Sequence, residues 1–218
     1  MHCIEMDHLL KNLQHDLLRM GAMVEEAIYN GVQSLVKRDA DLASAVLDGD
    51  EKINQLQLEI EDRCIKLIAT QQPMAKDLRK ISATWRISVD LERMADNVGD
   101  ICKAVIRLNG QAYLKPFEHI PQMADLCQKM VKDGLDAYIN EDVALAVQMS
   151  EMDHQVDTLY REIFKDLMEM MSANSNVVNQ GNQLIFIARF LERFGDHATN
   201  IAESVVYLVT GQRKDLNK

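Results

Sequence analysis

A short segment of this chain occurs twice. Residues 91–96 read LERMAD and residues 191–196 read LERFGD, which places the two copies 100 positions apart. Earlier in each half the correspondence continues at an offset of 103 positions, as between Asp50 and Asp153. The smaller offset indicates a short deletion in the second half, which we place around residues 71–73 because turns tolerate such changes. The sequence therefore predicts two homologous halves joined head to tail.

Each half shows the apolar periodicity of long helices. Apolar residues recur every three or four positions, and β-branched residues seldom alternate with polar ones, so helices are favoured over strands. Only 3 Pro and 9 Gly occur among 218 residues, which leaves little room for irregular segments. We predict an all-α protein made of two tandem homologous three-helix bundles, six helices in total. The predicted helices lie near residues 9–35, 42–67, 73–108, 121–139, 142–171 and 177–210.

One segment is dense in residues that break helices. Asn109-Gly110 is followed by Pro116 and Pro121, and this stretch falls where the repeat requires a boundary. We therefore predict a first domain over residues 1–109, a linker over 110–121 and a second domain over 122–218.

The composition limits the partners and the compartment that we expect. Acidic residues outnumber basic ones by 34 to 24, which gives a formal net charge of -10. Proteins that bind nucleic acid or anionic lipid concentrate Lys and Arg on one face, so neither is an expected partner. There is no apolar run long enough to insert into a membrane, no secretion signal and no CxxC pair. These features predict a cytoplasmic protein with reduced thiols.

The repeated motif carries acidic residues at helical spacing. At about 100° per residue, Glu92, Asp96 and Asp100 share one face of their helix, beside the apolar stripe, and Glu192 and Asp196 do so in the second half. Two carboxylates four positions apart repel each other and cost an isolated helix roughly 0.2–0.5 kcal/mol. Because the arrangement is present in both halves, we expect a bound cation to compensate it.

The second helix of each half offers a matching acidic face. Asp50 lies there in the first half, and Asp153 and Asp157 lie at the corresponding place in the second. Hard cations prefer oxygen ligands, and adjacent helices can present several carboxylates to one ion or a small cluster. We predict one site per half for divalent or trivalent ions, with Fe, Mn, Mg or Zn as candidates. The predicted metal ligands are Asp50, Glu92, Asp96, Asp100, Asp153, Asp157, Glu192 and Asp196.

Other patterns leave alternatives open. The spacing ExxH, by which ferritin-like bundles hold two irons, occurs at Glu5–His8 and Glu151–His154, but at different places in the repeat. A helical di-metal or metal-storage protein is thus one alternative, and a merely solvated acidic face is another. His197 is interpreted as a surface or capping histidine, because Asn97 stands in its place in the first half. There is no motif of a known catalytic set, so we expect no enzyme.

The tandem of three-helix units, each with Leu-Glu-Arg-x-x-Asp on its last helix, resembles the PhoU family. The segment QQPMAKDLR at residues 71–79, which leads into the first copy, strengthens the likeness. The resemblance covers residues 6–211 and implies two three-helix bundles. It also implies a cytoplasmic, homodimeric adaptor that negatively regulates phosphate uptake and phosphate-starvation signalling. The implied partners are the ATPase subunit of the phosphate ABC transporter and a sensor histidine kinase; a different phosphate permease is the alternative.

The resemblance also implies metal binding through E(D)xxxD motifs. These motifs match Glu92 with Asp96, Asp96 with Asp100, Glu192 with Asp196, and Asp153 with Asp157. The first half departs from the pattern where Asn54 follows Asp50, and the second departs where Asn200 and Phe190 replace Asp100 and Asp90. The two sites are therefore expected to differ in affinity or in the number of metal ions.

Overall fold

The computed structural model describes residues 2–111 and 118–216. Those residues form helices and turns and contain no strand, so the all-α prediction is confirmed. Among the described residues, no helix combines the length and apolar character needed to cross a lipid bilayer. The first half contains α1 (His2–Lys37), α2 (Ala40–Gln71) and α3 (Ala75–Arg107). The second half contains α4 (His119–Asn140), α5 (Val143–Ser150), α6 (Asp153–Ala173), the 3-10 turn η1 (Ser175–Val177) and α7 (Val178–Thr210).

The turns between the first two helices use the same chemistry in both halves. A residue with positive φ, Arg38 in one half and Glu141 in the other, ends the first helix. The next residue is an aspartate that caps the following helix. Asp39 Oδ1 accepts a hydrogen bond from Leu42 N at 2.9 Å, and Asp142 Oδ1 accepts one from Leu145 N at 3.0 Å. Because side-chain caps satisfy otherwise unpaired N–H groups, this aspartate defines where each second helix begins.

The structure differs from the prediction in the second half. The helix predicted over residues 142–171 is interrupted at Glu151 and Met152, where the backbone makes a single tighter turn before Asp153 starts α6. Neither Gly nor Pro marks this break, so no helix-breaking residue indicates it. Helix α4 begins at His119, before the end of the predicted linker at residue 121, and it includes Pro121, whose fixed φ suits a first helical turn. Residues 112–117 of that linker lie outside the described residues.

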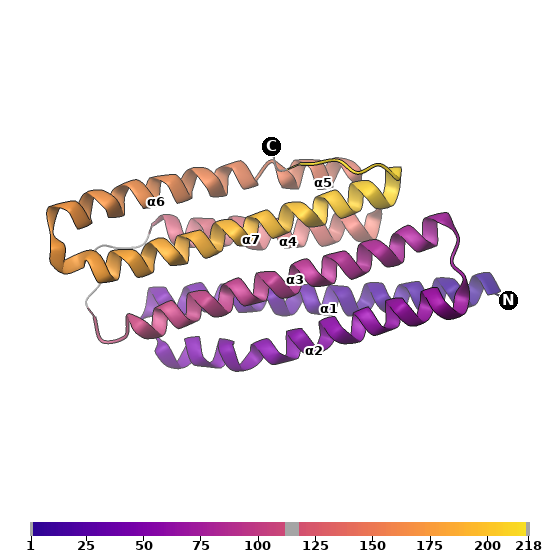
Figure 1. Ribbon diagram of the computed structural model, residues 1–218, viewed down its shortest axis with the longest axis horizontal. Coiled ribbons are helices and arrows are strands. Elements are labelled where there is room, and N and C mark those ends of the chain that lie inside the picture. Colours follow the sequence, from indigo (N-terminus) through magenta and orange to yellow (C-terminus); the bar gives the residue numbers. More distant parts are fainter. Residues whose placement is uncertain (1, 112–117, 217–218) are drawn as a thin grey trace.

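The two halves pack side by side. Figure 1 shows α3 and α7 antiparallel in the middle, with α2 and α6 outside them and α1 and α4 behind. One continuous apolar core runs through both halves. Gly21 of α1 allows a close approach to α4, since a Cβ there would lie 2.1 Å from the Leu135 side chain. The halves are joined further where the Thr84 and Tyr138 hydroxyls meet at 2.5 Å in the buried interior.

Candidate functional site

The acidic faces of the first half do meet. Asp50 of α2 faces the region of α3 that carries Glu92 and Asp96. Burial raises the pKa of Asp50, and the nearby charge of Asp96 raises it further. Burial likewise raises the pKa of Glu92, to which Asp96 and then Asp50 contribute. Because neighbouring charges shift a pKa only over short distances, these three carboxylates form one group.

Polar neighbours satisfy only part of this first group. The Asn54 side chain donates a hydrogen bond to Asp50 Oδ2 at 3.2 Å. The Oδ1 atom of Asn54 is buried and has no hydrogen-bond partner among the described residues. A buried acceptor without a donor costs about 1–3 kcal/mol. Asn54 therefore adds a further oxygen that a cation could use beside the carboxylates.

The second half brings four carboxylates together, and more deeply. Asp153 at the start of α6 is only 6% exposed. Burial, followed by the charges of Asp157, Asp196 and Glu192, raises the pKa of Asp153 to about 7. Burial also raises the pKa of Glu192, and Asp196 adds to the effect. The unpaired oxygens Asp153 Oδ1 and Glu192 Oε2 are buried without a hydrogen-bond partner in the described part of the chain.

A glycine explains why Asp153 lies so close to α7. A Cβ on Gly195 would stand 2.5 Å from Asp153 Oδ1, so the carboxylate occupies the space that a side chain would fill. In the first half Ala95 stands at the position of Gly195, and the matching Asp50 is only half-buried. The break before α6 also places Asp153 in a first helical turn, where the helix dipole favours negative charge.

Asp100 has a different environment from the other predicted ligands. Its carboxylate accepts a hydrogen bond from Lys103 Nζ at 2.9 Å, and 42% of its side chain is exposed. The pKa of Lys103 is raised, first by Asp100 and then, to a smaller extent, by the charges of Asp96 and Asp50. Lys103 thus supplies part of the positive charge that the first group needs. Glu203 stands at this position in the second half, where the Arg189 side chain instead forms an ion pair with Glu192.

The residue types, but not their present arrangement, suit a hard cation. Within residues 2–111 and 118–216, no group of three or more His, Cys, Asp or Glu side chains is arranged so that it could hold a metal ion. The unpaired carboxylate oxygens of Asp153 and Glu192 nonetheless lie on adjacent helices, and they share a repulsion that a cation would remove. Oxygen ligands of this kind suit Mg, Mn or Fe better than Zn.

The ExxH spacing does not add histidine to the second group. Both Glu151 and His154 are exposed, and Asp153 between them is the residue that points inward. A ferritin-like di-iron site needs its histidines beside the carboxylates in the bundle interior. This arrangement favours a carboxylate site over one with histidine ligands.

Sequence reasoning missed one polar contact between the halves. Asp90 of α3 is buried, and its Oδ1 lies 3.1 Å from His197 Nδ1 and accepts a hydrogen bond from Asn200 Nδ2 at 2.9 Å. His197 is therefore not a surface or capping histidine, as its position in the repeat had suggested. The available signal was the asymmetry of the repeat, because Asp90, His197 and Asn200 all differ from their counterparts.

Comparison with known proteins places this geometry in a family. The PhoU domain model matches the chain twice, over residues 17–105 and 120–205. A phosphate-specific transport system accessory protein PhoU homolog from Clostridium acetobutylicum is 43% identical over 209 residues, covering 95% of each protein. The phosphate-specific transport system accessory protein PhoU homolog from Caulobacter vibrioides is 39% identical, and the alignment covers 93% of this chain and 89% of that protein.

Solved structures of similar proteins share the whole architecture. The crystal structure of PhoU from Pseudomonas aeruginosa superposes with a TM-score of 0.90 at 33% identity, covering 94% of this chain and 99% of that one. The phosphate transport system regulatory protein PhoU from Streptococcus pneumoniae gives a TM-score of 0.91 at 32% identity, covering 96% and 99%. The tandem arrangement of three-helix bundles is thus the fold of these proteins too.

Proposed function

Because this chain belongs to the PhoU family, we propose that it is an accessory protein of a phosphate-specific transport system. The observation that carries the proposal is the double match of the PhoU domain, which spans almost all of both halves. Relatives with this name match the chain over nearly their full length. The role is one of binding and regulation, and no reaction forms part of it.

In finer detail, we propose a metal-dependent cytoplasmic adaptor. It would bind the ATPase subunit of the phosphate ABC transporter and a sensor histidine kinase, and so restrain phosphate uptake and phosphate-starvation signalling. Both partners and the homodimer remain proposals that rest on the family resemblance. Transfer of a signal between them requires that each partner state bind with a different affinity.

The carboxylate groups suggest what a cation would do in such an adaptor. A bound cation would supply the positive charge that like-charged side chains on neighbouring helices need. In the first half Asp50, Glu92 and Asp96 would hold it, and thereby fix α2 against α3. In the second half Asp153, Asp157, Glu192 and Asp196 would fix α6 against α7. The helical surfaces offered to a partner would then depend on the metal.

A genetic experiment tests the accessory role. The gene is deleted, and a reporter driven by a phosphate-starvation promoter is measured in phosphate-rich medium. The proposal expects the reporter to become active in the deletion strain and to be repressed again by the wild-type gene. A reporter that stays silent in the deletion strain would contradict the role. Phosphate-transporter genes beside this gene would distinguish this system from one that serves a different permease.

A pull-down experiment tests the metal-dependent adaptor. The double variant Glu92→Gln with Glu192→Gln removes one carboxylate from each group at nearly constant volume, whereas Glu51→Gln with Glu151→Gln changes two exposed acids. We expect the first pair to weaken binding of both the ATPase subunit and the kinase, and the control pair to leave it unchanged. If both pairs bind alike while folded, the metal has no part in partner binding.

The metal-storage alternative makes a different prediction. It requires an open coordination position and uptake of many equivalents of metal, in addition to convergent histidines. Elemental analysis after loading with Fe under air separates the two: the adaptor binds a small fixed number of ions in each half, whereas a storage protein continues to take up iron.

A further inference from the structure

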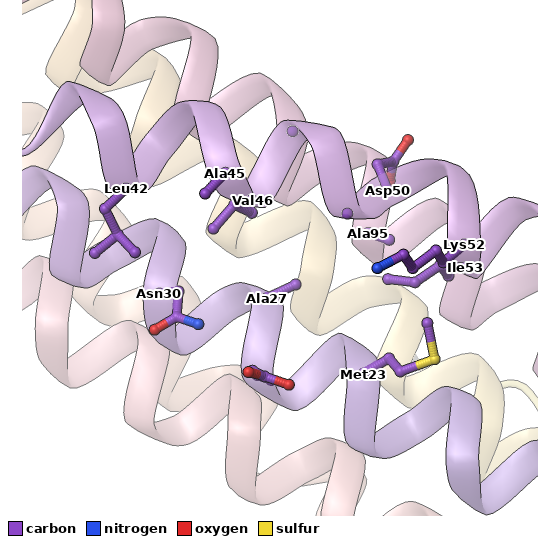
Figure 2. A pocket seen from close by; sticks show the side chains of 13 residues that line it. Met23, Ala27, Asn30, Leu42, Ala45, Val46, Asp50, Lys52, Ile53 and Ala95 are labelled. Atoms are coloured by element: carbon purple, nitrogen blue, oxygen red, sulfur yellow. The ribbon is translucent and has the colours of Figure 1, made fainter.

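The first half has a groove that shares only Asp50 with the carboxylate group described above. It lies between α1 and α2, with part of α3 as its floor, and has a volume of about 450 Å³. Figure 2 shows Met23 and Ala27 of α1 on one wall, facing Val46 and Ile53 of α2 on the other. Ala95 of α3 lines its base. The groove is therefore mostly apolar and opens along the outer side of the first bundle.

The repeat provides an internal comparison, because the same place is filled in the second half. Small residues of the groove have larger counterparts there, as the offset of 103 positions shows. These counterparts are Met130 for Ala27, Gln148 for Ala45, Met149 for Val46 and Met152 for Gly49. Met130 and Met149 are buried, and Met152 packs against the core. The fold can thus close this space, and the first half leaves it open.

A second hollow does exist in the second half, but at another place. It lies between α4 and α6, further along the bundle, and its lining includes Gln122, Asp125, His154 and Glu162. The place that matches the groove is filled by Met130, Met149 and Met152, so the groove is a specific feature of the first half.

Gly49 is an independent indication that something approaches this surface. Glycine is unfavourable in the interior of a helix, because it loses the most conformational freedom. Among the described residues, a Cβ at Gly49 would meet no atom within 4 Å, so packing against them does not require the glycine. Close approach of another chain to the α2 backbone does explain it, since glycine permits such contacts.

The rim of the groove is acidic. Glu26 lies on the α1 side and Asp50 on the α2 side. Asp41 and Asp48 are exposed, and they share a face of α2 with the groove residues Ala45 and Lys52, because positions 41, 45, 48 and 52 follow helical spacing. Three carboxylates outside the candidate metal groups, those of Glu26, Asp41 and Asp48, thus stand against one ammonium. Complementarity of charge favours a cationic partner.

We propose that this groove binds an amphipathic helix of another protein, with a narrow apolar face flanked by Lys or Arg. From Leu42 to Ile53 the α2 wall rises about 16 Å, which matches three turns of a helix. The guest helix would insert its apolar side chains over Gly49 and complete a four-helix arrangement, as amphipathic helices do in apolar grooves. This docking needs no metal ion, so it can hold or fail separately from the adaptor mechanism.

Three synthetic 16-residue helical peptides test the proposal on the full chain. They share one Leu and Ala face and carry Lys, Gln or Glu elsewhere. Their binding is followed by fluorescence anisotropy to wild type, Gly49→Met, Ala45→Gln and the control Ser44→Met. The first two variants place the residues of the second half at two positions that line the groove. Ser44→Met places the same side chain on an exposed position outside the groove.

The proposal expects the Lys peptide to bind wild type and Ser44→Met alike, and more tightly than the Gln and Glu peptides. Gly49→Met is expected to raise the Kd about tenfold or more. If Gly49→Met does not fold, the same increase is expected of Ala45→Gln. Equal binding to the filled-groove and control variants overturns the proposal, as does absence of binding. It is also overturned if wild type sediments as a dimer that Gly49→Met abolishes, or if only a small apolar dye occupies the groove.

Discussion

Asp153→Asn is predicted to stabilise the metal-free protein at neutral and alkaline pH. The native carboxyl group has its pKa raised from an ordinary 3.8 to about 7, first by burial and then by the surrounding carboxylates. The folded state therefore holds a proton that the unfolded state releases between these two values. Stability is unaffected below pH 4, falls as the pH rises through this window, and stays reduced above pH 7.

The magnitude follows from the size of that change. Each pH unit between the two pKa values lowers the free energy of unfolding by about 1.4 kcal/mol. The loss of stability caused by Asp153 is therefore roughly 1.5 kcal/mol at pH 5 and roughly 4 kcal/mol at pH 8. Little of this is screened by water, because Asp153 is 6% exposed. Asparagine has nearly the same shape and no charge. It should therefore raise the free energy of unfolding by up to these amounts, with a larger gain at pH 8.

Urea unfolding of EDTA-treated protein at pH 5, 6.5 and 8 measures the effect. Asp50→Asn is the matched variant in the first half, and its gain should be smaller because Asp50 is half-buried and bonded to Asn54. Saturating Mn²⁺ should stabilise wild type at pH 8 but affect Asp153→Asn much less. A gain for Asp153→Asn that is absent, or equal at all three pH values, would refute the reasoning about this carboxyl group.

Other predictions concern the packing around the site. Gly195→Ala should destabilise the protein by about 1–3 kcal/mol, because its Cβ would displace Asp153 Oδ1. The control Gly99→Ala, whose Cβ would meet only ordinary contacts, should be neutral or stabilising. Equal effects of the two variants on urea unfolding would show that Gly195 does not make room for Asp153. His197→Ala should cost about 1–3 kcal/mol by leaving Asp90 partly unpaired between the halves, which thermal unfolding checks; an unchanged midpoint would show that the contact is unimportant.

The sequence predicted the helices well, because their signals are local. Apolar periodicity and the turn at residues 71–73 act within a few residues, as do the caps at Asp39 and Asp142 that the structure shows. The break before α6 was missed because Glu151 and Met152 are not helix-breaking residues. Local patterns of this kind determine where helices form, but tertiary contacts decide whether they stay continuous.

The candidate site was predictable in its residue types but not in its depth. Helical spacing in two copies was enough to group Glu92 with Asp96 and Glu192 with Asp196. That Asp153 lies deeper than Asp50 depends on Gly195 and on the packing of α6 against α7, which only the structure shows. The pairing of Asp90 with His197 depends on the antiparallel contact of α3 with α7. No periodicity within one helix encodes such a contact.

Isothermal titration calorimetry of chelator-treated protein with Mn²⁺ decides whether the two carboxylate groups bind metal. Two classes of site are expected in wild type, one for each half. The double variant Asp153→Asn with Asp196→Asn should lose one class, and Asp50→Asn with Asp96→Asn the other. If wild type takes up no Mn²⁺, or if both double variants bind it as wild type does, the carboxylate groups are not metal sites and the account is wrong.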